Sequence, residues 1–260
     1  RGATLTIRKF PKNPMTIEKL IEHKSITKEA AKLLENLVKA KYNIFISGGT
    51  GSGKTTFLNA LSNFIPKDER LITIEDSAEL QIVGIENLVS LETRNSNTTG
   101  AGELTIRDLI RSSLRMRPER IVVGEVRGKE ALDMLQAMNT GHDGSLSTGH
   151  ANSSLDMLSR LETMVLTGSE GLPLNAVRKQ IASSIDIIIH LSRMRDKTRR
   201  VVEISELCGL ENGEVKLNTL YEFKENEESK QDCVEGELKR TKNLFRNYTK
   251  LYSAGIDINV

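Results

Sequence analysis

Short apolar runs alternate with longer amphipathic stretches along the first part of the chain. The apolar runs have the length of buried strands, and the amphipathic stretches repeat their apolar residues with the period of a helix. The predicted strands are 43–47, 71–76, 88–94, 120–126 and 145–150, and the predicted helices are 27–41, 56–65, 105–118 and 129–140. This alternation predicts an α/β fold whose mostly parallel sheet has right-handed crossovers and is covered on both faces.

The pattern changes after about Leu155. The later elements are predicted as helices 154–166 and 173–185 and as strands 186–193 and 200–207. The charged stretch Arg193–Arg200 joins the two strands, and we interpret it as a solvated hairpin turn. Residues 224–240 are rich in charge, which predicts a loosely ordered segment before a closing amphipathic stretch.

The charge balance and the cysteine content narrow the possible partners and the possible cellular compartment of the chain. Lys and Arg number 37 against 35 Asp and Glu, so neither nucleic acid nor acidic lipid is favoured as a dominant partner. Cys208 and Cys233 are too few for a disulfide framework, which favours a reducing cytoplasm. No apolar run approaches the roughly 18 residues of a membrane span, and no signal peptide opens the sequence. Because the chain begins with Arg1 and not Met, we expect a fragment of a longer protein.

The strongest chemical signal is the run Gly48–Thr55, GGTGSGKT, which fits the pattern G-x-x-x-x-G-K-[ST]. Only a glycine-rich turn lets backbone N–H groups wrap closely around a bent, highly charged triphosphate. Lys54 brings a positive charge to the outer phosphates, and Thr55 offers a hydroxyl to Mg²⁺. The strand before the run and the helix after it supply the expected context, so a turn without ligand is disfavoured.

Carboxylates follow two other predicted strands. Glu125 comes at the end of one, and Glu75, Asp76 and Glu79 come at or just past the end of another. Because ligands bind at the carboxyl edge of a parallel sheet, these acids are candidates for holding a metal or orienting water. The structural alternatives are a strand-end carboxylate for Glu125 and a solvated helix start for the other three.

Arginines recur where a phosphate site would use them. Arg94 ends a predicted strand, and Arg107, Arg111 and Arg115 recur every four residues on one helix face, with Arg117 beside them. Such a stripe either solvates the helix or neutralises phosphate charge in the same or a neighbouring subunit.

The run GHDGSLSTGHAN holds His142 and His150. The residues alone leave three interpretations open: a metal site, a loop without chemistry, or a sensor of a ligand bound elsewhere. A zinc site is disfavoured, because the other histidines are His23 and His190 only and neither cysteine belongs to a C-x-x-C pair.

In this order, the motifs resemble those of the secretion ATPases of type II and type IV secretion and type IV pilus systems. ISGGTGSGKTT is similar to the family's Walker A motif, TIEDSAEL to its Asp box, RMRPERIVVGEVRG to its Walker B motif and GHDGSLSTGHAN to its His box. LDMLQAMNTGH and SRLETMV resemble the tight-adherence (Flp) pilus subgroup most closely. The resemblance runs from TLTIRKFP to IIIHLSR, nearly the whole chain.

The resemblance implies how ATP and Mg²⁺ are held. The nucleotide-binding residues would be Gly49, Thr50, Gly51, Ser52, Gly53, Lys54, Thr55 and Thr56, with Arg8 as a further candidate. The Mg²⁺ ion would contact Thr55 directly and Glu125 through water.

The resemblance also implies catalytic roles. Glu79 resembles the general base that orients the attacking water. His150 resembles the histidine near the γ-phosphate that links nucleotide state to subunit movement, so the sensor interpretation is preferred. Arg94, Arg111 and Arg115 are similar to arginines that reach a nucleotide, some of them from the neighbouring protomer. Gly149 departs from the bulkier apolar residue of relatives, which predicts a looser backbone before His150.

An architecture and a setting follow from the same resemblance. The fold would be a RecA-like P-loop NTPase with a mostly parallel central sheet, C-terminal helices and a β-hairpin. Residues 1–24 would be a linker and the remnant of an N-terminal domain, 25–223 the ATPase domain, and 224–260 a polar segment with an amphipathic helix. Members of this family form homo-oligomeric hexamer rings at the cytoplasmic face of the inner membrane. Their partner is an inner-membrane platform protein, and their work is pilin assembly or protein export.

Two rival functions remain open at this stage. A nucleic-acid motor would use a similar sheet, but the balanced charge and the 4% aromatic content argue against a stacking channel. The other rival is a ring subunit that binds nucleotide as a switch without hydrolysis. A GTPase is disfavoured because no N-K-x-D occurs, and an ABC-type dimer because no L-S-G-G-Q occurs. We therefore expect a protein-secreting ATPase that uses ATP and Mg²⁺ and has no nucleic-acid partner.

Overall fold

The computed structural model describes residues 2–7, 14–96, 102–169 and 171–257. Its helices are α1 (Ile17–Glu22), α2 (Lys28–Lys39), α3 (Lys54–Ser62), α4 (Ile106–Ser113) with a 3₁₀ turn η1 (Leu114–Met116), α5 (Glu130–Asn139), α6 (Ser154–Gly168), α7 (Leu174–Ser184) and α8 (Thr249–Ser253). Its strands are β1 (Ile44–Gly48), β2 (Arg70–Glu75), β3 (Asn87–Glu92), β4 (Arg120–Val123), β5 (Leu146–Gly149), β6 (Ile187–Arg193), β7 (Arg199–Glu211), β8 (Glu214–Glu225) and β9 (Gly236–Arg240).

The strands form one sheet in the order β3-β2-β4-β5-β1-β6-β7-β8-β9. The strands from β3 to β6 in that order pair in parallel. The strands from β6 to β9 pair as antiparallel neighbours. The predicted α/β fold with a mostly parallel sheet is therefore confirmed, and an antiparallel extension lies along one edge.

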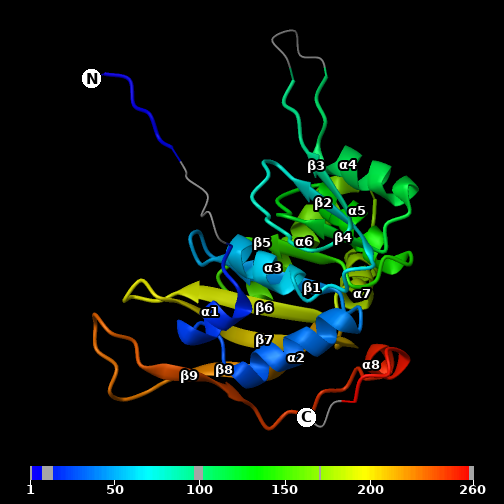
Figure 1. Cartoon of the computed structure of the whole chain (residues 1–260). Coiled ribbons are helices and arrows are strands. Elements are labelled where there is room, and N and C mark those ends of the chain that lie inside the picture. Colours follow the sequence, from blue (N-terminus) through cyan, green and yellow to red (C-terminus); the bar gives the residue numbers. More distant parts are fainter. Residues whose placement is uncertain (1, 8–13, 97–101, 170, 258–260) are drawn as a thin grey trace.

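Helices cover both faces of the parallel part of the sheet (Figure 1). On β1, Ile44 and Ile46 pack in the core formed with α2 and α3, whereas Phe45 packs in the core formed with α4 to α7. Side chains of a strand alternate between faces, so a strand buried on both faces is apolar throughout. This explains why β1, β2, β4 and β6 are visible in the sequence as largely apolar runs.

Polar residues fix the starts of several helices. Thr27 accepts a hydrogen bond from the backbone N–H of Ala30 and is the N-cap of α2. Thr105 and Asp108 form a reciprocal capping box at the start of α4. These caps satisfy N–H groups that have no partner within the helix.

The C-terminal part contains more strand than the sequence analysis predicts. β7 and β8 form a hairpin through Asn212 and Gly213, which both have positive φ angles, 52° and 82°. β9 pairs with β8 inside the stretch 224–240, so the prediction of a loosely ordered segment there is wrong for 236–240. The short helix α1 was also not predicted.

The last described residues pack at the opposite ends of the strands from the loop after β1 (Figure 1). The carboxylate of Glu206, which is fully buried, accepts hydrogen bonds from the backbone N–H groups of Arg246 and Asn247. Lys250 in α8 lies 2.6 Å from Asp143 and 2.7 Å from Asp186. Within the described ranges, no helix combines the length and the apolar character needed to cross a bilayer.

Candidate functional site

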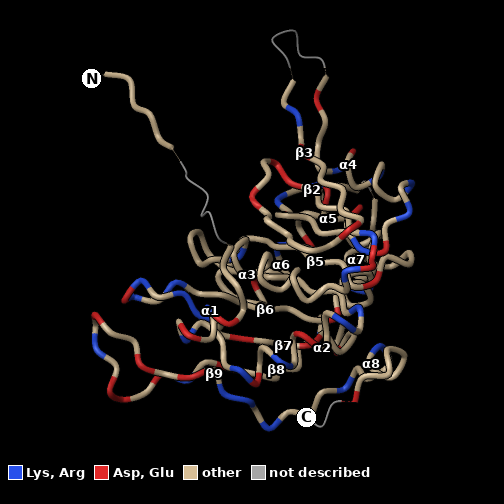
Figure 2. Tube along the Cα trace, in the orientation of Figure 1, with Lys and Arg blue, Asp and Glu red and all other residues tan. Residues whose placement is uncertain are grey.

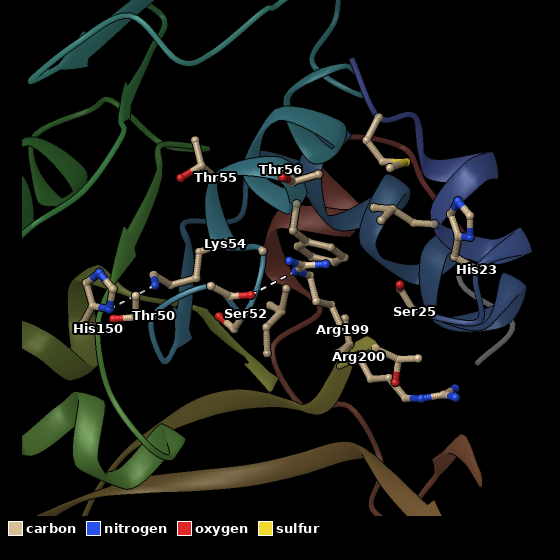
Figure 3. A pocket seen from close by; sticks show the side chains of 18 of the residues that line it. His23, Ser25, Thr50, Ser52, Lys54, Thr55, Thr56, His150, Arg199 and Arg200 are labelled. Carbon is tan, nitrogen blue, oxygen red and sulfur yellow. Dashed lines mark hydrogen bonds between the residues drawn. The ribbon is translucent and has the colours of Figure 1, made fainter. Parts of the chain in front are cut away.

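The motif-bearing loops meet at the carboxyl ends of the parallel strands. A cavity of about 610 Å³ opens there, and Thr50–Thr56, Glu79, Glu125 and His150 all line it (Figure 3). These residues follow β1, β2, β4 and β5, which lie in one parallel block of the sheet. These residues are far apart along the chain, and the order of the strands in the sheet brings them together. Arg8 lies outside the described residues.

The loop after β1 has a backbone that only glycine adopts easily. Gly51 and Gly53 have φ angles of 73° and 95°. A Cβ on Gly48 would lie 2.5 Å from both the Leu191 carbonyl oxygen and the Ser52 hydroxyl. Gly53 is also the N-cap of α3, which has no side-chain cap and no acidic residue in its first turn. The free N–H groups and the helix dipole therefore present a site for an anion.

Lys54 is buried at the inner end of this loop. Its Nζ donates to the carbonyl oxygens of Gly48 at 3.0 Å and Gly49 at 3.1 Å, and it lies 3.2 Å from His150 Nδ1. Gly49 thus contacts the lysine and does not line the cavity wall. Burial lowers the pKa of Lys54, while the nearby Glu125 acts in the opposite direction. An ammonium held in this way is poised to exchange backbone carbonyls for phosphate oxygens.

A chain of charged groups continues from Lys54. His150 Nε2 lies 2.9 Å from Glu125 Oε1, and Glu125 Oε2 lies 2.7 Å from Arg127 Nη2. Arg127 also contacts Asp76 at 3.2 Å. Burial and the charge of Lys54 lower the pKa of His150 below its ordinary value of 6.5. His150 is therefore neutral near pH 7, and one of its ring nitrogens is a hydrogen-bond donor.

Glu75 organises the backbone that carries Glu79. Its Oε1 accepts hydrogen bonds from the N–H groups of Glu79 and Leu80, both at 3.0 Å. A Cβ on Gly124 would lie 3.0 Å from Glu75 Cγ, so glycine is needed where β4 ends. Burial raises the pKa of Glu75. Glu75 thus does not line the cavity itself, but fixes the loop whose Glu79 does.

The residues fit a magnesium ion that arrives with a nucleotide. In the described part of the chain, no group of three His, Cys, Asp or Glu residues is arranged to hold a metal. Thr55 and Glu125 both line the cavity. Glu125 Oε1 is buried and accepts no well-aligned hydrogen bond, even though His150 Nε2 is close. A carboxylate oxygen of this kind suits a water ligand of Mg²⁺, which keeps several waters and takes its other ligands from phosphates.

Three predicted arginines do not line the cavity. Arg94 donates from Nε to the Gly102 carbonyl oxygen at 2.7 Å. Arg111 forms an ion pair with the buried Asp133 at 2.7 Å, and Arg115 donates to the Arg111 carbonyl oxygen at 3.3 Å. A role for these arginines at this cavity within one chain has no support in the geometry.

Other residues line the cavity that the sequence analysis did not select. Among them are Arg127, two residues from Glu125, His23 and Ser25 near the start of the chain, and Arg199 and Arg200 at the start of β7. The interpretation of Arg193–Arg200 as a solvated turn is therefore wrong for Arg200, which is buried, whereas Arg199 is exposed and also lines the cavity. Arg199 Nε donates to the Gly51 carbonyl oxygen at 2.9 Å. The repeated positive charge of this stretch was the only signal in the sequence.

Gly149 lies in a tightly packed place in β5. A Cβ there would come within 2.9 Å of Met157 Sδ and of Phe45 Cε1. These two side chains fill the space that a larger residue would take. The expectation of a looser backbone before His150 is therefore wrong.

Comparisons with known proteins agree with this arrangement. A family model described as "Type II/IV secretion system protein" matches residues 1–251. The conjugal transfer protein TrbB of Rhizobium radiobacter is 35% identical over 86% of this chain and 67% of TrbB. The type IV secretion system protein PtlH of Bordetella pertussis is 41% identical over 66% of this chain and 52% of PtlH.

A solved structure has the same fold. The crystal structure of the VirB11 ATPase from the Brucella suis type IV secretion system, in complex with sulphate, superposes with a TM-score of 0.61. It is 33% identical, and the match covers 76% of this chain and 60% of that one. The expected RecA-like fold is thereby confirmed. The chain spans about half to two thirds of the length of these relatives.

Proposed function

The chain belongs to the type II/IV secretion system protein family, and we propose that it hydrolyses ATP to drive protein secretion or pilus assembly. One observation carries this proposal. The glycine-rich loop with Lys54 and Thr55, and the side chains of Glu79, Glu125 and His150, line a single cavity.

In this proposal each side chain has a distinct task in the transfer of the γ-phosphate to water. The loop N–H groups and Lys54 bind the β- and γ-phosphates and stabilise the charge that develops there. Glu79 orients the attacking water in line with the bond that breaks, and neutral His150 donates a hydrogen bond to the γ-phosphate. Thr55, and Glu125 through water, would hold Mg²⁺, which would supply positive charge to the phosphates.

The far end of the cavity suits a nucleoside. Met15, Leu20 and Val201 provide apolar surface there, and Ser25 and His23 provide polar groups. A mostly apolar wall with few polar groups is typical of a site for an organic ring. We infer that the base of the nucleotide lies against this wall, although residues 1–24 were expected to be a linker.

Oligomer formation is a further part of the proposal. Arg94, Arg111 and Arg115 do not line the cavity of their own chain, so a role at a nucleotide would require a neighbouring protomer. This favours a homo-oligomeric ring, for which the family resemblance implies a hexamer. The finer assignments stay proposals of the same kind: an inner-membrane platform protein as partner, the cytoplasmic face of that membrane as location, and the tight-adherence subgroup.

The test is hydrolysis of Mg-ATP by the chain and two variants. Lys54→Ala should abolish both nucleotide binding and phosphate release. Glu79→Gln should still bind ATP but release phosphate at least about a hundredfold more slowly, because it removes the group that orients water. Lys28→Ala, which changes an exposed lysine on α2, is the control and should hydrolyse ATP normally.

The same assay separates the rival functions. Normal turnover by Lys54→Ala would refute the assignment of the site. Tight binding without any phosphate release by the unchanged chain would favour a nucleotide switch. Turnover stimulated severalfold by single-stranded DNA, and lost in high salt, would favour a nucleic-acid motor.

A further inference from the structure

The hairpin between β6 and β7 brings positive charge beside the phosphate loop. Figure 2 shows Lys and Arg concentrated along this turn. In the sequence, Asp196 lies among them. Strand β6 is the parallel neighbour of β1, and Leu191 of β6 is in register with Gly48. Arg199, the first residue of β7, pairs with Arg193 at the end of β6. The sheet itself thus carries Arg199 to the loop.

Arg199 contacts the loop at two of its glycines. Its Nε donates to the Gly51 carbonyl oxygen at 2.9 Å (Figure 3). Its Cδ lies 3.3 Å from the place that a Cβ on Gly53 would occupy. The missing side chain at Gly53 lets the arginine stem lie against the loop, and Arg199 forms part of the cavity wall.

The charge of Arg199 is not neutralised by a carboxylate. Over the described ranges, no Asp or Glu forms an ion pair with it. Its neighbour Arg195 is paired with Glu225, and Arg127 across the cavity is paired with Glu125. A guanidinium has five N–H donors, and among the residues that the structure describes Arg199 donates from Nε alone.

The next residues hold this part of β7 in place. Arg200 is buried and donates to the carbonyl oxygens of Lys24 and Val234. The backbone N–H of Val201 donates to the Ser25 carbonyl oxygen at 2.8 Å. The backbone that carries Arg199 is therefore fixed by the fold before any ligand binds, which lowers part of the entropic cost of a contact.

We propose that Arg199 is a nucleotide-contacting arginine supplied by the same chain. Its Nε binds the phosphate loop, and its terminal nitrogens bind the phosphate chain at the end nearer the ribose. Planar guanidinium groups bind phosphate oxygens in pairs, which a point charge does not reproduce. This inference rests on the proposed function, because it requires that the cavity binds a nucleoside polyphosphate. The contact made by Arg199 is additional to that of Lys54 in the loop. It does not depend on the arginines that lie outside the cavity.

Calorimetric titration of ADP with Mg²⁺ into the chain and three variants tests this. Arg199→Gln should weaken ADP binding by at least about tenfold, because one charge-assisted contact to phosphate is lost. Arg199→Lys keeps the charge and should recover part of the affinity. Lys197→Gln removes a positive charge from the same exposed turn without touching the cavity, and should bind ADP as the unchanged chain does.

The outcomes distinguish this inference from the function on which it rests. Arg199→Gln with an affinity within twofold of the unchanged chain would overturn the inference alone. Equal weakening of ADP binding in Arg199→Lys and Arg199→Gln would overturn the inference as well. Such a result would indicate that Arg199 binds the loop and makes no contact with phosphate. An unchanged chain that binds no ADP would overturn the proposed function together with the inference.

Discussion

Glu75 influences the proposed general base without lining the cavity. Both N–H groups that it binds belong to the turn that carries Glu79, and its carboxyl group is almost fully buried. Its effect should therefore depend on an acceptor oxygen at this place. Burial raises the pKa of Glu75, and the two backbone N–H groups that it binds act in the opposite direction.

Replacing Glu75 tests this view. Glu75→Ala removes the acceptor and should lower kcat for ATP hydrolysis by about tenfold or more, with KM within about twofold. Glu75→Gln keeps an acceptor oxygen and should retain most of the turnover. Steady-state kinetics of the two variants decide the matter. An alanine variant with normal kcat, or a glutamine variant as slow as the alanine one, would contradict it.

Two histidines, His150 of the cavity and His190 of β6, make stability depend on pH. Burial lowers the pKa of both His150 and His190 below the ordinary 6.5. As pH falls through 6.5, the unfolded chain takes up these protons before the folded chain does, so the free energy of unfolding falls. Urea unfolding of the nucleotide-free protein at pH 8 and pH 5.5 should show this loss. His150→Gln should show a smaller loss, and an identical loss would contradict the assignment.

Sequence motifs identified the phosphate loop with Lys54 and the side chains of Glu79, Glu125 and His150, because these residues sit at fixed places in known patterns. They did not identify Arg127 or Arg199. Nothing in the spacing of a basic stretch distinguishes a cation that faces solvent from one that faces a cavity. That distinction depends on which strand lies beside β1, and only the folded sheet supplies it.

At the level of elements, β5 depends on a match between a glycine and the side chains around it. Met157 of α6 and Phe45 of β1 occupy the space beside Gly149. Adding side-chain volume there must displace one of them, because interiors are close-packed.

A double-mutant cycle measures this match. Gly149→Val should lower the free energy of unfolding by about 1–3 kcal/mol through overpacking. Met157→Ala should lower it by about 2–5 kcal/mol through a cavity. The double variant should lose clearly less stability than the sum of the two single variants. The reason is that Met157→Ala makes room for the valine, and the valine fills part of the space that the methionine leaves. Chemical denaturation provides the values, and strict additivity would contradict the packing described here.

The strands differ in how clearly the sequence predicts them. Strands β1, β2, β4 and β6 are largely buried and appear as apolar runs. In contrast, β3 is partly exposed, and β5 is buried but contains Ser147 and Thr148. β8 and β9 form the open edge of the sheet, carry charged residues such as Glu222, Lys224 and Lys239, and lack that pattern. The Asn212–Gly213 pair is a known hairpin signal, and it was the one local cue to β8.

At the level of the whole molecule, the cavity is built by distant parts of the sequence. The stretch around α1 supplies one wall, the parallel strands supply the chemistry, and β7 supplies a further arginine. The division into 1–24, 25–223 and 224–260 remains a prediction. The contribution of Met15 and Leu20 to the cavity argues that the first of these segments works together with the second.

The proposed ring makes a prediction about concentration. If neighbouring protomers complete each site, specific ATPase activity should rise steeply with protein concentration. Arg115→Ala and Lys54→Ala should each be inactive alone. Mixing the two should restore part of the activity, because some sites then combine an intact loop with an intact neighbouring arginine. Activity that is proportional to concentration, and no recovery on mixing, would contradict sharing between protomers.

The most direct measurement is a crystal structure of the chain with Mg²⁺ and a non-hydrolysable ATP analogue. We expect the triphosphate in the loop Gly48–Thr55, with Lys54 Nζ moved from the Gly48 and Gly49 carbonyl oxygens to phosphate oxygens. Glu125 should lie one water molecule away from the ion. A nucleotide bound elsewhere, or an ion far from Thr55 and Glu125, would contradict the account.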